Sequence, residues 1–128
     1  MEDLKNKKIL IVDDDDDLRT ILVDKFKDSG FEPSTAPDGE LGLKVALETH
    51  PDLILLDVMM PVMDGWSMLK KLREDDWGKD AKVIMLTVSE DSENVAKAVE
   101  KQSIGYLIKT KQSLDEIITK VKEMIAMH

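Results

Sequence analysis

The sequence contains no cysteine, only two histidines and no long hydrophobic run. The absence of cysteine excludes disulfide bonds, thiolate metal ligands and a cysteine nucleophile, and it suits a reducing compartment. A membrane-spanning helix needs about 20 consecutive apolar residues, which this chain nowhere provides. The amino-terminal segment MEDLKNKK also lacks the apolar region of a signal peptide. We therefore expect a cytoplasmic protein that does not contact the membrane.

Basic residues are in the minority, with 18 lysines and arginines against 27 aspartates and glutamates and a net charge of -9. This charge disfavours nonspecific attraction to the phosphates of nucleic acids or to anionic membranes. A length of 128 residues fits one domain with a well-developed hydrophobic core. We expect a single domain over residues 1–128 and no direct contact with nucleic acid.

Four short apolar runs each end in a polar residue of a different kind. They are ILIV (9–12) before Asp13, LILL (53–56) before Asp57, VIML (83–86) before Thr87, and YLI (106–108) before Lys109. Aliphatic runs without polar alternation are typical of parallel strands buried on both faces. Because parallel sheets place ligand sites at the carboxyl ends of their strands, we expect the four polar residues to share one edge of the sheet.

Segments with helical periodicity separate these strands. Leu18, Ile21, Leu22 and Phe26 form one apolar stripe, and Gly30 follows as a helix stop. Segment 31–36 is a weak strand whose Pro33 assigns it to the edge of the sheet. Three further helices are indicated. Asp38 can cap a helix that extends to about Thr49, and Gly65 precedes a helix that carries Trp66, Leu69 and Leu72. The spacing of Val95, Ala98 and Val99 indicates another helix. The last helix has Ser113 and Glu116 as a capping box and an apolar face of Leu114, Ile117, Ile118, Val121 and Ile125.

The alternation of strands and helices predicts an α/β fold built from five βα units. Short right-handed connections place helices on both faces of a central parallel sheet, which gives a three-layer sandwich. A closed barrel would need about eight such units.

An acidic run, Asp13 to Asp17, follows the first strand. Asp15, Asp16 and Asp17 fall where a helix begins, so capping and the helix dipole account for them. Asp13 and Asp14 precede the helix and are expected beside Asp57. Three carboxylates at one edge repel one another and call for a cation, and oxygen-only ligands favour Mg²⁺, with Mn²⁺ as a possible substitute.

Thr87 and Lys109 complete this arrangement. A hydroxyl and an ammonium group beside a metal-binding carboxylate are what a phosphoryl group on that carboxylate needs, because its oxygens require neutralisation and hydrogen bonds. Asp57 is then the nucleophile that forms an acyl phosphate.

These residues resemble the receiver domain of two-component response regulators over essentially the whole chain. The matching segments are ILIVDDD (9–15), PDLILLDVMMPVMDG (51–65), VIMLT (83–87) and YLIK (106–109). The resemblance implies a flavodoxin-like sheet in the order 2-1-3-4-5, which is the known order of this family and does not follow from the periodicity of the sequence. It also implies one receiver domain over 1–128, which we expect to be free-standing and to lack an output domain.

The resemblance further implies a role for each site residue. Asp57 would be the phosphoacceptor, and Asp13, Asp14, Asp57 and the backbone carbonyl of Met59 would hold Mg²⁺. Lys109 would pair with the phosphoryl oxygens, and Thr87 and Tyr106 would be the switch residues. The donor would be a histidine kinase or phosphotransfer protein. The response would be binding of a downstream protein through the helix around 95–99, strand 106–108 and the last helix, by a monomer or a phosphorylation-dependent dimer.

Two residues depart from the family pattern. Thr110 follows Lys109 where the family has a proline in a cis peptide, and a cis bond before a non-proline residue costs about 2.5–4 kcal/mol. We expect that peptide to be trans and the loop shifted. Val88 follows Thr87 where the family favours alanine or glycine, which predicts slower dephosphorylation than in Val88→Ala.

The residues leave two other functions open. One is a Mg²⁺-dependent phosphohydrolase, because Asp13 and Asp15 form the Asp-x-Asp pattern of aspartyl-phosphate phosphatases. The other is a receiver-like binding module that is not phosphorylated. A phosphoacceptor is favoured over both, since no site residue is missing, and such a protein is a signalling domain that contributes to its own phosphorylation and dephosphorylation rather than an enzyme.

Overall fold

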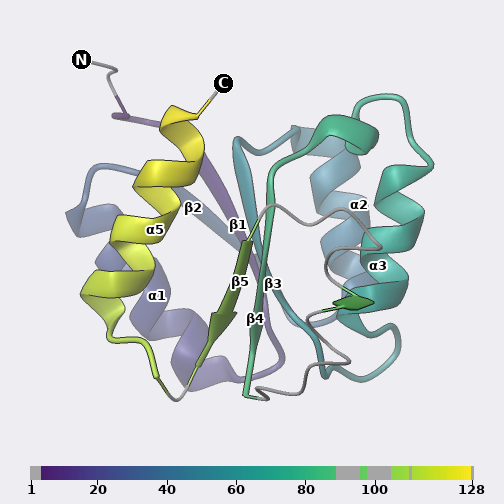
Figure 1. Ribbon diagram of the computed structural model, residues 1–128, viewed down its shortest axis with the longest axis horizontal. Helices are drawn as coiled ribbons and strands as arrows, with labels where there is room; N and C mark the ends of the chain where they lie inside the picture. The colour runs from purple at the N-terminus through teal and green to yellow at the C-terminus, as the bar shows by residue number, and fades with distance from the viewer. Residues whose placement is uncertain (1–3, 89–95, 98–104, 110, 128) are drawn as a thin grey trace.

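A computed structural model describes residues 4–88, 96–97, 105–109 and 111–127 of the chain. Within these residues, a five-stranded parallel sheet lies between two layers of helices (Figure 1). The strands are β1 (Lys8–Val12), β2 (Glu32–Ala36), β3 (Leu53–Asp57), β4 (Val83–Thr87) and β5 (Gly105–Ile108). The helices are α1 (Asp16–Asp28), α2 (Gly39–Thr49), α3 (Gly65–Arg73) and α5 (Leu114–Ala126), with a short 3₁₀ helix η1 (Gly78–Asp80).

The strand order is β2-β1-β3-β4-β5, as the resemblance implied. Strand β2 lies at one edge of the sheet, where Pro33 pairs with Ile9 of β1 and its missing N–H costs no ladder hydrogen bond. In β3 and β4 every residue is buried, which explains why their sequences are continuously apolar up to the last position.

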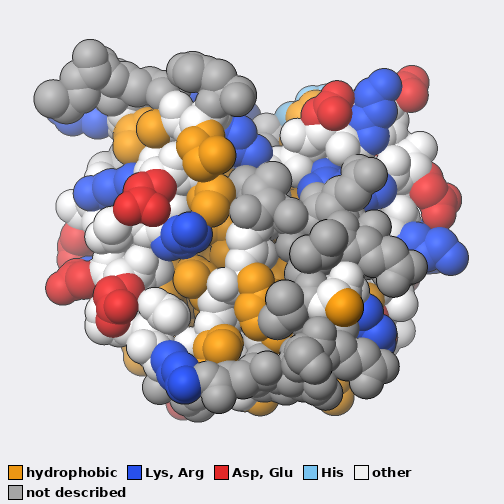
Figure 2. Space-filling view, in the orientation of Figure 1, with side chains coloured by type: hydrophobic (Ala, Val, Ile, Leu, Met, Phe, Trp, Pro, Cys, Tyr) orange, Lys and Arg blue, Asp and Glu red, His pale blue; other side chains and the backbone are white. Residues whose placement is uncertain are grey.

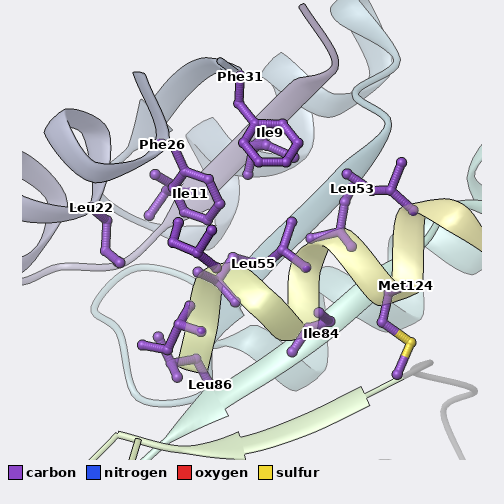
Figure 3. Packing of buried hydrophobic residues seen from close by; sticks show 14 of the residues in the cluster. Ile9, Ile11, Leu22, Phe26, Phe31, Leu53, Leu55, Ile84, Leu86 and Met124 are labelled. Carbon is purple, nitrogen blue, oxygen red and sulfur yellow. The ribbon is translucent and has the colours of Figure 1, made fainter. Parts of the chain in front are cut away.

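Two hydrophobic cores lie on opposite faces of the sheet, because successive strand residues point to opposite sides. Ile9 and Ile11 of β1 point toward α1 and α5, where they pack with Leu22 and Phe26 (Figure 3). The neighbouring residues Leu10 and Val12 belong to the second core, which α2 and α3 cover. Figure 1 shows these pairs of helices on either side of the strands. Each face of the sheet therefore has its own cover of helices.

The helix boundaries follow the capping residues in the sequence. Asp38 caps α2 by accepting a hydrogen bond from the backbone N–H of Leu41. Ser113 and Glu116 form the predicted capping box of α5. Asp64 caps α3 by accepting from the N–H of Ser67, a role that was not predicted from the sequence. These caps satisfy backbone N–H groups that have no partner inside the helix.

One residue of the predicted stripe on the first helix is placed wrongly by periodicity alone. Leu22 and Phe26 are fully buried, but Ile21 is 47% exposed. The stripe is narrow because β1 and β2 lie beneath one side of α1, and Ile21 falls beyond it. Of the predicted helix with Val95, Ala98 and Val99, these three residues lie outside the described residues, and only 96–97 are described, as helical.

No helix in the described part of the chain is long and apolar enough to cross a membrane. All five strands run in the same direction, so their carboxyl ends meet at one edge of the sheet. This edge is where the polar residues that end the apolar runs come together.

Candidate functional site

The buried polar side chains of the described residues all lie at the carboxyl edge of the sheet. They are Asp13, Asp57 and Thr87, whose exposed fractions are 1%, 5% and 2%. Asp57 is the last residue of β3, Thr87 is the last residue of β4, and Asp13 directly follows β1. Burying charged or polar groups costs free energy unless they have partners, so this concentration marks a site rather than ordinary packing.

Asp13, Asp14 and Asp57 form a carboxylate cluster, with one oxygen from each lying within 4.8 Å of the others. Asp14 is exposed, so the cluster opens to solvent on one side. The donors are all hard oxygens with no sulfur or imidazole among them, which is the ligand set that Mg²⁺ prefers. The residues present therefore fit a magnesium ion.

Lys109 provides the positive charge of the site. Its Nζ lies 2.7 Å from Oδ2 of Asp13 and 3.3 Å from Oδ1 of Asp57. The backbone N–H of Lys109 also donates to the carbonyl of Thr87 at 2.6 Å, which connects the residue after β5 to the end of β4. The four predicted strand exits, Asp13, Asp57, Thr87 and Lys109, are thus brought together at one edge.

The pKa values reflect this crowding of charges. Burial, together with repulsion from Asp13, raises the pKa of Asp57 from 3.8 to about 6 against the opposing effect of Lys109. Burial acts to lower the pKa of Lys109, but the hydrogen bond and charge of Asp13, together with Asp57, outweigh it and raise this pKa. Lys109 therefore stays charged at neutral pH, and a further cation would stabilise the charged form of Asp57.

The acidic run divides at the start of α1: Asp15 caps the helix, as predicted, whereas Asp13 and Asp14 belong to the carboxylate cluster. Asp13 accepts a hydrogen bond from the N–H of Asp15 through Oδ1 at 2.9 Å. Asp15 is the N-cap of α1, and its carboxylate accepts from the N–H groups of Asp17 and Leu18. The carboxylate of Asp15 is thus occupied as a helix cap, and Asp15 is not a member of the carboxylate cluster.

Arg19 is a site neighbour that was not predicted from the sequence. Its Nη1 donates to the backbone carbonyl of Asp13 at 2.5 Å, and its Nη2 pairs with the carboxylate of Asp16. The side chain is only 17% exposed. No spacing rule predicts a hydrogen bond from an arginine to a carbonyl six residues earlier. The one hint in the sequence is that Arg19 closely follows an acidic segment.

The loop after β3 passes close to Asp57. The N–H of Gly65 donates to the carbonyl of Val58 at 2.9 Å, and a Cβ atom at Gly65 would lie 2.2 Å from the carbonyl oxygen of Asp57. Glycine is therefore required where α3 begins. Met59 lies within this loop and is 71% exposed, so its side chain does not pack in the hydrophobic core.

The remaining predicted site residues lie around this edge. Tyr106 of β5 is paired with Met85 of β4 and packs, partly buried, against the core beneath α2 and α3. Val88 follows Thr87 and is 61% exposed. Thr110 lies outside the described residues, so the predicted shift of its loop stays a prediction.

Comparison with known proteins agrees with this geometry. Residues 9–122 match the family model of the response regulator receiver domain. The transcriptional regulatory protein PrrA of Mycobacterium leprae is 37% identical over 122 residues, which cover 95% of this chain and 51% of PrrA. The chain spans about half the length of the curated relatives it matches.

Solved structures of similar length share the fold. A putative response regulator from Chloroflexus aurantiacus has a TM-score of 0.88 and 30% identity, with 96% of this chain and 100% of that one covered. The response regulator TrrA of Thermotoga maritima, solved with Mg²⁺ and BeF, has a TM-score of 0.81 and 32% identity, with 92% and 98% covered. The chain therefore belongs to the receiver domain family of two-component response regulators, which are signalling domains.

Proposed function

We propose that Asp57 accepts a phosphoryl group from a phosphohistidine on a histidine kinase or phosphotransfer protein. A carboxylate oxygen of Asp57 forms a bond to phosphorus while the bond from phosphorus to the histidine nitrogen breaks. The imidazole then leaves with a proton taken from solvent. The product is an acyl phosphate on Asp57, which adds a charge of about -1.5 to -2 at the carboxyl edge of the sheet.

The observation that carries this proposal is the surroundings of Asp57. It is a buried carboxylate with two further carboxylates within 4.8 Å and the Lys109 ammonium 3.3 Å from one of its oxygens. A structural aspartate would need only the lysine. The extra carboxylates raise the electrostatic energy unless a cation joins them, and a cation at that point lies where an incoming phosphoryl group must be neutralised.

Asp13, Asp14 and Asp57, with the backbone carbonyl of Met59, would hold the metal. Mg²⁺ is the ion proposed, and Mn²⁺ is expected to replace it because it accepts the same oxygen ligands. When bound, the ion supplies positive charge between the attacking carboxylate and the phosphoryl oxygens. Asp13 is already positioned by Asp15 and Lys109, so it needs little reorganisation.

Thr87, Lys109 and Tyr106 would turn the modification into a change of surface. The phosphoryl oxygens would draw the Thr87 hydroxyl and the Lys109 ammonium toward Asp57, and movement at the end of β4 would reach Tyr106 on its neighbour β5. Changing a state from 1% to 99% populated requires about 5.5 kcal/mol of differential stabilisation. Two or three charge-assisted hydrogen bonds of about 1.5–3 kcal/mol each are of this size.

The response would be read at the face formed by β5, α5 and the predicted helix between β4 and β5. Figure 2 shows hydrophobic side chains gathered along the side of α5 that faces β5, with charged side chains on the outer side of the helix. A groove there is lined by Leu107, Gln112, Lys120 and Glu123 among others. Such a surface suits a downstream protein partner or a second copy of the domain.

We further propose that the domain is cytoplasmic and does not itself bind nucleic acid; the net charge of -9 disfavours attraction to phosphates. PrrA is named as a transcriptional regulator and is about twice the length of the matched region. In proteins of that kind the receiver would act on DNA only through another part of the chain. The domain would also contribute to its own dephosphorylation.

Phosphorylation can be tested without knowing the natural donor. The protein is incubated with Mg²⁺ and acetyl phosphate, and the modified residue is located by mass spectrometry. Beryllofluoride binding, followed by ¹⁹F resonance, gives a second measurement. We expect modification at Asp57 that requires Mg²⁺ and is absent from Asp57→Asn.

The same experiment separates the other candidate functions. Modification that persists in Asp57→Asn would show that a different residue is the acceptor. Multiple turnover of added phosphate esters would instead favour a phosphohydrolase. A protein that takes up neither phosphate nor beryllofluoride in Mg²⁺ would be a binding module, and the proposal would be wrong.

A further inference from the structure

Asp13 is held by three contacts besides its ion pair with Lys109. Its N–H donates to the carbonyl of Ala36 at the end of β2, at 3.1 Å. Its side chain accepts from the N–H of Asp15, and its carbonyl accepts from the guanidinium of Arg19 at 2.5 Å. Because the last contact involves a charged donor, it is among the stronger hydrogen bonds of the loop.

Asp14 differs sharply from the other two members of the carboxylate cluster. Asp13 and Asp57 both have Lys109 as an ion-pair partner. Within the described part of the chain, the Asp14 side chain is exposed and makes no hydrogen bond or ion pair, yet one of its oxygens lies within 4.8 Å of the other two residues. Among these residues, the backbone at Asp14 is therefore the connection through which its position can be controlled.

The backbone at Asp14 is set by the peptide unit that joins it to Asp13. The carbonyl of Asp13 and the N–H of Asp14 lie in one plane and point in opposite directions. Holding that carbonyl limits rotation of the peptide plane, and so restricts the directions in which the Asp14 side chain can leave the chain once the dihedral angle φ of Asp14 is set. Arg19 holds this carbonyl from α1, and it also pairs with Asp16 in the first turn of the same helix.

We propose that Arg19 is a positioning residue for the metal site, acting on Asp14 through the carbonyl of Asp13. The inference rests on the proposed magnesium site but not on phosphoryl transfer. Arg19 does not touch the metal or the phosphoryl group. It keeps the one otherwise unsupported ligand directed at the other two, so that binding the ion does not require the loop to be ordered first.

A purely electrostatic role for Arg19 predicts the opposite effect on metal binding. Removing a positive charge from the neighbourhood of a divalent cation strengthens binding of that cation by Coulomb's law. Loss of a residue that orients a ligand weakens metal binding, typically by about 10–100-fold. The sign of the change in Mg²⁺ affinity therefore decides between the two roles.

The test measures Mg²⁺ affinity by isothermal titration calorimetry, without any phosphoryl donor, in the wild type and in Arg19→Gln and Arg19→Lys. We expect both variants to bind Mg²⁺ about tenfold more weakly, because neither glutamine nor lysine reproduces the bridge between the Asp13 carbonyl and Asp16. Lys27→Gln is the matched control, since it removes the same charge from an exposed position of α1 and should leave the affinity near that of the wild type.

A double-mutant cycle separates positioning of Asp14 from a general loosening of the loop. In an Asp14→Asn background, Arg19→Gln should cause little further loss of affinity, because the carboxylate on which it acts is gone. An equal loss in both backgrounds would overturn the inference. So would unchanged or tighter binding by Arg19→Gln, or wild-type affinity in Arg19→Lys.

Thermal unfolding without metal shows whether each variant is folded, and Arg19→Lys provides the measurement if Arg19→Gln is not. A wild-type protein that does not bind Mg²⁺ would defeat the magnesium site of the proposed function and this inference with it. If the wild type binds Mg²⁺ and Arg19→Gln binds it with the same affinity, this inference alone would be wrong.

Discussion

Lys109 Nζ lies 2.7 Å from Oδ2 of Asp13, closer than the 3.3 Å that separates it from Oδ1 of Asp57. The ammonium group is thus shared between two buried carboxylates rather than committed to the predicted phosphoacceptor. Two acids with one base leave an excess negative charge at the site, and Asp14 adds to it. A further cation would offset this imbalance.

The first prediction concerns the removal of that shared lysine. Lys109→Met keeps much of the side-chain volume but leaves Asp13 and Asp57 buried without a cation. Breaking a buried pair in this way should lower the free energy of unfolding by about 3 kcal/mol. Urea denaturation at neutral pH measures the loss, and saturating Mg²⁺ should restore part of it. Lys27→Met, on an exposed surface of α1, is the control and should change stability little.

The second prediction concerns the pH dependence of stability in the absence of metal. The pKa of Asp57 is raised from 3.8 to about 6, so between these values the folded protein binds more protons than the unfolded one. Stability contributed by this group is therefore fully present below pH 3.8 and is lost as the pH rises through about 6. Asp57→Asn removes the effect and should stabilise the protein by about 2–3 kcal/mol at about pH 7.5, with little gain at about pH 4.

Urea denaturation of both proteins in a chelating buffer measures this difference. An Asn substitution that stabilises equally at both pH values would show that relief of packing strain, and not titration of Asp57, is responsible. Asp52→Asn is a suitable control, because Asp52 is an exposed aspartate on the opposite edge of the sheet that accepts a hydrogen bond from the N–H of Lys8.

Local sequence patterns predicted the fold well because its strands and caps are local features. The continuous apolar runs of β3 and β4 and the capping box at Ser113 and Glu116 each need only a few neighbouring residues to be recognised. The edge position of β2 followed from a single proline at position 33, since a central strand cannot lose an N–H. The sheet order itself came from the family resemblance, because periodicity does not determine which strands are neighbours.

The features that the sequence did not predict depend on how helices pack on the sheet and on the conformation of the loops between them. Ile21 is exposed because the width of the contact between α1 and the sheet, not the helical period, decides how far the buried stripe extends. The contact of Arg19 with the Asp13 carbonyl depends on how the chain turns from β1 into α1. The close approach of Gly65 to the backbone of Asp57 in β3 involves main-chain atoms, which a pattern of side chains does not reveal.

The third prediction concerns Gly65. In Gly65→Ala the new Cβ would lie 2.2 Å from the carbonyl oxygen of Asp57, so the backbone must move. Alanine improves helix propensity by about 1 kcal/mol, but overpacking against a backbone atom costs about 1–3 kcal/mol or more. We expect a net loss of stability in urea denaturation and weaker beryllofluoride binding, because the loop carrying Met59 shifts. In Gly105→Ala the nearest atom is a side-chain carbon of Ile84 at 3.1 Å, so a smaller effect is expected there.

The fourth prediction concerns the lifetime of the acyl phosphate. Val88 directly follows the buried Thr87 and is 61% exposed, so its side chain stands on the solvent side of the site rather than in the core. A branched side chain there should hinder the approach of water to the phosphoryl group on Asp57. Val88→Ala should therefore lose its phosphoryl group faster than the wild type, whereas Val88→Ile should not.

The decay of the phosphorylated protein is followed by intact mass after removal of acetyl phosphate. Equal lifetimes for the wild type and Val88→Ala would contradict the prediction. Because Val88 is largely exposed, its truncation should hardly change the free energy of unfolding, so that a shorter lifetime can be assigned to access by water and not to loss of structure.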